Sequence, residues 1–245
     1  MKEKIFDVIV IILSIFILIE LLINKTLISS SVIDALNIWV YNLIPTLFPF
    51  FIISDFLINY NIIDYIPKLI KKICKTLFNI NDNMLIILLL SMISGFPSNA
   101  RNTRNLFNLG LIDLDEANHI LIFSHFSNPV FILTTIATSF FNNKKAGIIL
   151  LISHYFSNFV LGILCRNKFK HNQTNKTNIT LKNNFGNIFI SSIKRAIDTI
   201  LMICGIVVVF LILSTIIINT FNFSSYNEMI IKGIFEITIG IKDLV

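Results

Sequence analysis

Charged residues are scarce in this chain: Asp, Glu, Lys and Arg together make up 14% of its 245 residues. A soluble domain carries about 25%, so this shortage argues against an ordinary soluble fold. No basic stripe with interleaved aromatic residues is present either, and we therefore expect no nucleic-acid partner. The net charge of +6 comes instead from lysines and arginines that cluster between apolar runs, as topology determinants of membrane proteins do.

Residues that bind metals or perform catalysis are also few. The three cysteines are far apart in the sequence: Cys74, Cys165 and Cys204. Their spacing supports neither a disulfide framework nor a zinc site. His119, His125 and His154 lack the spacing of a metal-binding pair and an accompanying carboxylate, so we interpret them as polar residues facing the interior of a helix bundle. No nucleophile elbow, phosphate-binding glycine loop or HExxH motif is present. We expect no catalytic residue, no metal and no cofactor, and hence no enzyme.

Long apolar runs dominate the rest of the chain, which is 55% hydrophobic with a mean hydropathy of +0.79. A run of about 20 residues is long enough to span a bilayer as a helix. We therefore predict an all-α polytopic protein of the cell membrane with five spans: 5–23, 32–58, 119–141, 146–164 and 188–219. The first run is also compatible with a signal peptide. Its length and the lack of a small-residue cleavage site favour an uncleaved span.

Two of the predicted segments carry local irregularities. Pro45 and Pro49 should bend or break the second span near its middle. Asp55, near the end of that span, should be solvated at the membrane interface. Residues 62–78 combine apolar residues at helical spacing with four lysines, which predicts an amphipathic helix on the cytoplasmic surface. A basic loop is the alternative.

The segment 84–110 is predicted to enter the membrane and return on the same side. Its apolar part, 84–94, is too short to cross about 30 Å of hydrocarbon. The lysine-rich segments 68–75 and 166–182 should both be cytoplasmic. The chain between them must cross an even number of times, and the spans 119–141 and 146–164 already supply two crossings. We therefore predict a re-entrant hairpin with its tip near Gly95 and Pro97, followed by a helix capped by Asp113 and Glu116.

Three motifs follow one another around this hairpin. They are Ser94-Gly-Phe-Pro-Ser-Asn-Ala-Arg101, Gly110-Leu-Ile with Glu116-Ala117, and the stretch from Phe123 to Ile132. Their order and spacing resemble the Gate domain, also called the nucleoside-recognition domain, and in particular sporulation integral membrane proteins of the YlbJ type. Glu236-Ile-Thr-Ile-Gly-Ile-Lys242 resembles the motif that begins the second half of these proteins.

The resemblance implies a transporter-like fold of inverted repeats, each with a re-entrant hairpin and a broken helix. It divides the chain into an anchor (1–31), a first repeat (32–165), a cytoplasmic loop (166–187) and the start of a second repeat (188–245). Because family members continue further, the chain is expected to be truncated. Asn99 and Asn128 stand where relatives have Gly, and we expect both to adopt the left-handed backbone that Asn tolerates.

Candidate substrate-binding residues come from three segments: Gly95, Pro97, Ser98, Asn99 and Arg101; Ser127, Asn128 and Pro129; Glu236 and Thr238. Interrupted helices expose backbone groups that bind solutes, and a carboxylate within the membrane is a candidate coupling site. Each segment has a structural alternative. The hairpin is then held by arginines that reach the interface, the second break is a proline kink, and Glu236 lies at a frayed end.

Two functions follow from this reading. One is a sporulation membrane protein that resembles a transporter of nucleoside-like polar solutes. The other is a scaffold, or a truncated inactive fragment, that transports nothing. The expected partners are the lipid bilayer, a small polar solute and other sporulation membrane proteins.

Overall fold

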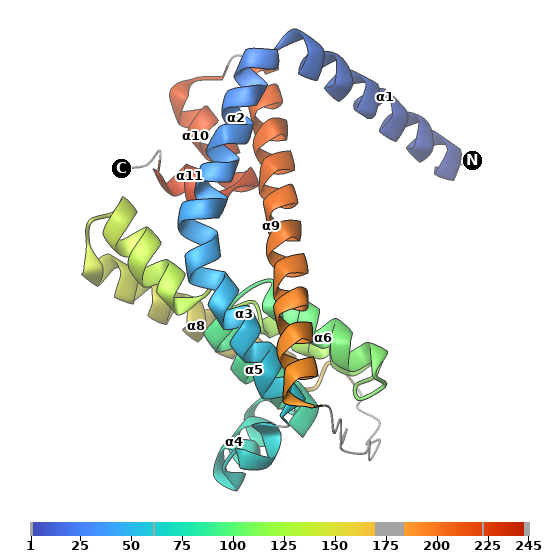
Figure 1. The fold of residues 1–245 in the computed structure, drawn as a ribbon, viewed down its shortest axis with the longest axis vertical. Helices are drawn as coiled ribbons and strands as arrows, with labels where there is room; N and C mark the ends of the chain where they lie inside the picture. The colour runs from blue at the N-terminus through green and yellow to red at the C-terminus, as the bar shows by residue number, and fades with distance from the viewer. Residues whose placement is uncertain (1, 61, 170–183, 222, 243–245) are drawn as a thin grey trace. The chain divides into compact units, whose positions relative to one another are not determined.

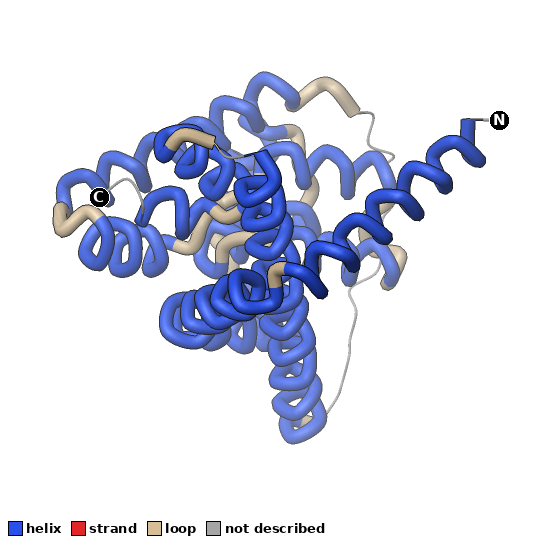
Figure 2. The backbone as a smooth tube through the Cα atoms, turned by 90° about the horizontal axis from the view of Figure 1, so that it is seen from above, coloured by secondary structure: helices blue, strands red, loops and turns tan. Residues whose placement is uncertain are grey.

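The computed structural model describes residues 2–60, 62–169, 184–221 and 223–242. Figure 2 shows helices joined by short loops, with no strand in these ranges. The chain divides into two compact units, one formed by residues 1–42 and 201–245 and the other by residues 43–200.

The first unit contains the two ends of the chain. Its elements are α1 (Lys2–Ile23), α2 (Lys25–Ile38), the later part of α9 (Phe185–Phe221), α10 (Ser225–Phe235) and α11 (Ile237–Lys242). Helix α2 runs beside α9 (Figure 1), and the hydroxyl groups of Ser31 and Thr215 lie 2.7 Å apart between them. The side chains of α1 are almost all exposed and apolar, as expected for a helix surrounded by lipid.

The second unit holds the hairpin and the interrupted helix. Its elements are α3 (Ile44–Asn59), η2 (Ile62–Tyr65), α4 (Lys68–Phe78), α5 (Asp82–Ser94), α6 (Ser98–Asn108), α7 (Leu114–Phe123), the π-helix η3 (Phe131–Phe140), α8 (Lys144–Cys165) and the first part of α9. The core of this unit is built around α5, whose residues Met84, Leu85 and Ile87 pack with Phe123 and Phe126.

Four helices are long and apolar enough to cross a membrane: 4–23, 25–59, 144–165 and 185–221. They match four of the five predicted spans, and the all-α polytopic membrane fold is confirmed. The fifth predicted span, 119–141, is two short helices, α7 and η3, separated by the non-helical stretch 124–128. The Ser-Asn-Pro sequence therefore interrupts the helix fully, and does not merely bend it.

The segment predicted to be a re-entrant hairpin folds back on itself as α5 and α6, and its return to the same side of a membrane stays a prediction. Two hydrogen bonds join the start of α5 to the residues that follow α6. Asn83 Nδ2 donates to Leu111 O at 2.9 Å, and Asn81 Nδ2 donates to Glu116 Oε1 at 2.6 Å. The chain thus returns beside its starting point before α7 begins. Asp113 and Glu116 form the predicted capping box at the start of α7.

The irregular segments differ in detail from their predictions. The bend in the second span appears as a five-residue π-helix, η1 (Trp39–Leu43), which ends two residues before Pro45, while Pro49 lies inside α3 without interrupting it. The π-helix shifts the register where proline removes a backbone donor. The amphipathic helix is shorter than predicted, because Pro67 separates η2 from α4.

Candidate functional site

The tip of the α5–α6 hairpin crosses the interruption between α7 and η3. The backbone N–H of Phe96 donates to Phe126 O at 2.7 Å. Gly95 has φ +75°, and a Cβ there would lie 2.9 Å from the Cα of Asn128 and closer still to its backbone nitrogen. Only glycine allows both this backbone conformation and this approach. The structure therefore places Gly95 against Asn128, while the role of the predicted residues Gly95, Pro97, Ser98, Ser127, Asn128 and Pro129 in binding a substrate stays a prediction.

Asn128 fastens this crossing through its side chain. Its Nδ2 donates to Ile93 O at 3.2 Å and to Ser94 O at 3.4 Å, while its Oδ1 accepts from the N–H of Phe131 at 3.1 Å. The expectation that Asn99 and Asn128 adopt left-handed backbone is wrong, because the only non-glycine residues with positive φ in the described chain are Asn79 and Asn142. Asn128 works as a side-chain cap for α5 and for η3, and Asn99 lies within α6.

Helix α8 satisfies backbone groups that the interruption exposes. His154 Nε2 accepts from the N–H of Ser127 at 2.9 Å, and Asn158 Nδ2 donates to His125 O at 3.3 Å. The Tyr155 hydroxyl donates to Met92 O in the hairpin. Sequence reasoning missed Tyr155 and Asn158. The signal was available, because polar residues at positions 154 and 158 of an apolar span share one helix face.

Asn99 is the buried side chain of the hairpin with an unused polar atom. It lies in the first turn of α6 and is fully buried. Its Nδ2 donates to the Ser124 hydroxyl at 3.3 Å, but its Oδ1 has no hydrogen-bond partner. Rotating the amide by 180° would only exchange which atom is unpaired. Ser98, Asn102 and Thr103, also buried, make α6 a polar helix inside an apolar unit.

The side chain of Arg101 is part of a cluster of charged residues with Asp55 and Arg195. Its guanidinium lies 3.7 Å from Asp55 Oδ1 and donates to Thr199 Oγ1 at 3.1 Å and to Arg195 O at 3.2 Å. Arg195 binds Asp55 through two contacts from its Nε, at 2.9 and 3.0 Å, and Ser192 donates to the same carboxylate at 2.6 Å. The expectation that Asp55 is solvated is wrong, since it is 2% exposed. Two arginines and several hydrogen bonds stabilise its charge inside the unit.

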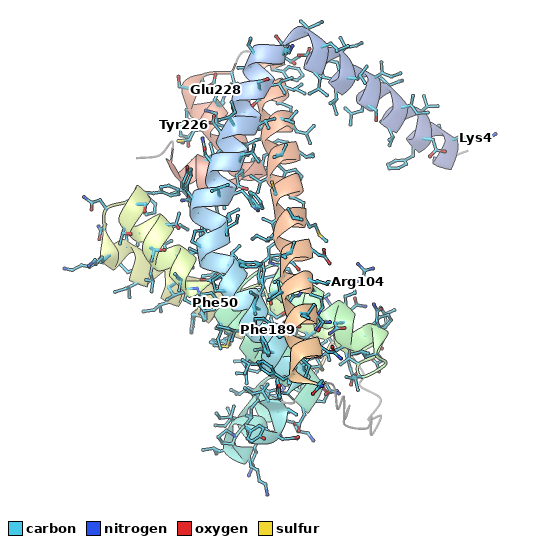
Figure 3. The ribbon with its side chains drawn as sticks, in the orientation of Figure 1. Lys4, Phe50, Arg104, Phe189, Tyr226 and Glu228 are labelled. Atoms are coloured by element: carbon cyan, nitrogen blue, oxygen red, sulfur yellow. The ribbon has the colours of Figure 1, made fainter. Side chains whose placement is uncertain are left out.

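Arg104 behaves differently from Arg101, although the two are three residues apart on α6. Arg104 is exposed, as its labelled side chain in Figure 3 indicates. Only one of the two arginines is therefore engaged by the protein. Because Arg101 is bound to α3 and α9, it positions α6 rather than presenting a free charge at the tip.

Glu236 and Thr238 lie in the first unit. Glu236 ends α10, and its carboxylate accepts from the N–H of Thr238 at 3.0 Å, which caps the short helix α11. Gly233 and Gly240 meet where α10 and α11 pack: a Cβ on Gly240 would lie 2.9 Å from the Gly233 nitrogen. The chain thus turns back sharply at Glu236.

The chemistry available in the second unit is hydrogen bonding. Hydroxyl and amide groups of Ser98, Asn99 and Ser124 gather where two helices are interrupted, and the nearby guanidinium of Arg101 is engaged elsewhere. In the described part of the chain, no three His, Cys, Asp or Glu residues group as metal ligands. The crossing therefore offers hydroxyl and amide groups to a polar ligand.

Part of the chain matches a known family of proteins. Residues 40–144, which include both the hairpin and the interrupted helix, match the family model Gate, described as nucleoside recognition. The chain is 25% identical to the sporulation integral membrane protein YlbJ of Bacillus subtilis (strain 168), in an alignment that covers 84% of this chain. The alignment covers 60% of the length of that relative. No solved structure matches the chain. The resemblance to Gate-domain membrane proteins of the YlbJ type, predicted from the hairpin motifs, is thereby confirmed.

Proposed function

We propose that this chain is a multi-pass protein of the bacterial cell membrane that binds a small, neutral, nucleoside-like solute where the hairpin crosses the interrupted helix. The observation that carries the proposal is the unpaired amide atom of Asn99, buried beside Ser124 at that crossing. A buried polar group without a partner costs about 1–3 kcal/mol. A solute that supplies the missing hydrogen bond would recover this energy.

A role in spore formation is the second part of the proposal. It is supported by the similarity to a relative named as a sporulation integral membrane protein. The Gate match over residues 40–144 supports the solute class, through its description as nucleoside recognition. Because Asn99 is fully buried, the solute reaches it only when α6 and the stretch 124–128 separate. Binding and opening of the hairpin are therefore coupled in this proposal.

Calorimetry with the purified full chain tests the binding. Uridine, adenosine and inosine serve as probes, and a sugar and a free amino acid serve as polar controls. Replacing Asn99 by Leu, which is similar in size and has no polar atom, should weaken nucleoside binding at least about tenfold, by loss of one buried hydrogen bond. The same change should leave thermal stability unchanged or higher. Asn108→Leu, on the exposed end of α6, is the matched control and should bind normally.

Transport is tested separately, in vesicles that contain the full chain. If the chain moves nucleosides and Glu236 couples the movement to an ion, Glu236→Gln should abolish uptake. Glu228→Gln, in the first turn of α10, is the matched control. Binding without uptake in the unchanged chain would limit the function to recognition.

A scaffold function has its own supporting observation. Several of the backbone groups that the two interruptions expose are already paired, with Asn128, His154 and Asn158 as partners. A rigid structural element needs such pairing. If no probe binds, and if variants of Asn99 change spore yield only in proportion to protein abundance, the scaffold function replaces the solute-binding one.

A further inference from the structure

Helix α4 lies at the level where two membrane spans end. Asn79, which ends α4 with φ +53°, donates from Nδ2 to Arg166 O at 3.0 Å. Arg166 directly follows Cys165, the last residue of the span formed by α8. The span that includes α3 ends at Asn59, nine residues before α4 begins. The span that ends at Asn59 and the span that ends at Cys165 thus both place α4 near a membrane–water interface.

The orientation of α4 fits this position. Helices α4 and α5 meet at a bend of 94°. Because α5 leads into the core of the unit, α4 runs across the direction that the hairpin takes. A helix at right angles to a membrane-inserted segment, at the level where spans end, lies along the membrane surface.

Three faces of α4 have distinct chemistry. The inward face holds Lys71, Cys74 and Phe78, and the Lys71 ammonium pairs with Asp82 at 3.2 Å. The apolar outer face is exposed: Leu69 is 67% exposed, Ile73 46% and Leu77 40%. Between these two faces lies a stripe of exposed lysines: Lys68, Lys72 and Lys75. At 3.6 residues per turn, the apolar face points away from the protein and the lysines flank it.

The charge on this surface has no acidic counterpart within the helix. The sequence of α4 contains no Asp or Glu, and Asp82 is already paired with Lys71. Arg166, whose carbonyl contacts Asn79, has a buried Nε without a hydrogen-bond partner. Tyr65, just before α4, is highly exposed, as aromatic residues at membrane interfaces are. The surface is therefore complementary to anionic phosphates beside acyl chains.

We propose that α4 is an interfacial helix that binds anionic phospholipid. Leu69, Ile73 and Leu77 enter the acyl region, and the three lysines hold the phosphate groups of phosphatidylglycerol-type lipids. A lysine near an anionic bilayer contributes about 1 kcal/mol, which is roughly a fivefold change in affinity. The lipid would hold the outer end of the hairpin base at the surface, independently of any solute at the tip.

Fluorescence quenching in lipid nanodiscs tests this proposal with the full chain. A variant with Ile73→Trp and Trp39→Phe carries one tryptophan, on the apolar face of α4. The nanodiscs contain phosphatidylcholine and a minority of phosphatidylglycerol, and only one of the two lipids is brominated at a time. Bromine on the acyl chains of phosphatidylglycerol should quench this tryptophan beyond the fraction expected from random mixing. High salt should reduce the preference.

Charge substitution provides the decisive comparison. Changing Lys68, Lys72 and Lys75 to Gln should lower the preference for phosphatidylglycerol about a hundredfold, because three contributions of about fivefold each multiply. The matched control changes three exposed lysines elsewhere: Lys25, Lys144 and Lys145. It should retain the preference. Equal quenching by both lipids in the unchanged chain, or an equal loss in both triple variants, would overturn the proposal, as would a tryptophan at 73 that neither lipid quenches.

Discussion

Substituting Gly95 by Ala should destabilise the protein strongly, because two separate penalties meet at this residue. Its backbone has φ +75° and ψ −178°, a region that only glycine occupies readily. Strain of this kind costs about 1–3 kcal/mol. The added methyl group would also meet the backbone of Asn128 within 2.9 Å of its Cα. Such an overlap with backbone is relieved only by moving the chain, at about 1–3 kcal/mol more.

That movement would also break the hydrogen bond from the N–H of Phe96 to Phe126 O, which is worth about 1 kcal/mol. The summed effect is about 3–7 kcal/mol, a large part of the stability of a typical protein. Gly110→Ala is the matched control. Gly110 also has positive φ, at +68°, but a Cβ there meets no atom within 4 Å. Its cost should be near 1 kcal/mol, from the backbone alone.

Thermal melting in mild detergent, followed by circular dichroism at a helix wavelength, measures the difference. A gap of at least about 2 kcal/mol corresponds to roughly 4–8 °C in a protein of this size. Gly95→Ala should therefore melt at least that far below Gly110→Ala. Melting temperatures within a degree of each other would refute the tight crossing of the hairpin tip and the interrupted helix.

Three further substitutions probe the hairpin and its surroundings by the same melting assay. Asp55→Asn should cost about 3–5 kcal/mol, because it leaves two arginines without their buried carboxylate, whereas Asp34→Asn, at an exposed position, should change little. Glu116→Ala should cost about 1–3 kcal/mol through loss of the capping box and of its hydrogen bond from the hairpin base, and the neighbouring exposed Asp115→Ala should stay within about 0.5 kcal/mol. Gly162→Ala should cost about 1–3 kcal/mol, because its methyl group would lie 2.7 Å from two phenylalanine rings; no change would mean that α8 packs less closely than described.

The fold-back of the hairpin segment could be predicted from two features of the sequence, which are the length of its apolar run and the number of membrane crossings around it. The apolar run 84–94 is too short for a bilayer, and the count of crossings, which took 119–141 as one span, favoured a segment that folds back. Both arguments depend only on length and charge, which the sequence states directly. The capping box at Asp113 was predictable for a similar reason, since its two partners are three residues apart and need no tertiary contact.

The partners of the interrupted segments were harder to predict, because they come from distant parts of the chain. Asp55 looked like an interfacial residue in a span read by itself. Its burial depends on Arg195, 140 residues away, which packs α9 against α3. The roles of Tyr155 and Asn158 depend on the antiparallel packing of α8 against α7 and η3. The hydrophobic periodicity of a single segment does not indicate which residues of other helices it contacts.

The error about Asn128 has a definite physical origin. The expectation of left-handed backbone rested on the tolerance of Asn for positive φ. The residue uses its amide instead, with two hydrogen bonds to the hairpin and one to η3. A glycine at this position cannot make those bonds. In this chain, therefore, the side chain of Asn128 holds the crossing together.

Other contacts of the hairpin explain how the structure tolerates a buried, unpaired amide atom at Asn99. The base of the hairpin is held by Asn81 and Glu116, its outer helix by Arg101 in the Asp55 cluster, and its tip by Asn128. These contacts offset the desolvation penalty of one unused hydrogen-bonding atom, which is about 1–3 kcal/mol. The three restraints differ in strength, because the charged one is buried and the tip depends on neutral hydrogen bonds. A hairpin that opens should therefore open first at its tip, between Asn99 and Ser124, while Arg101 and the base remain bound.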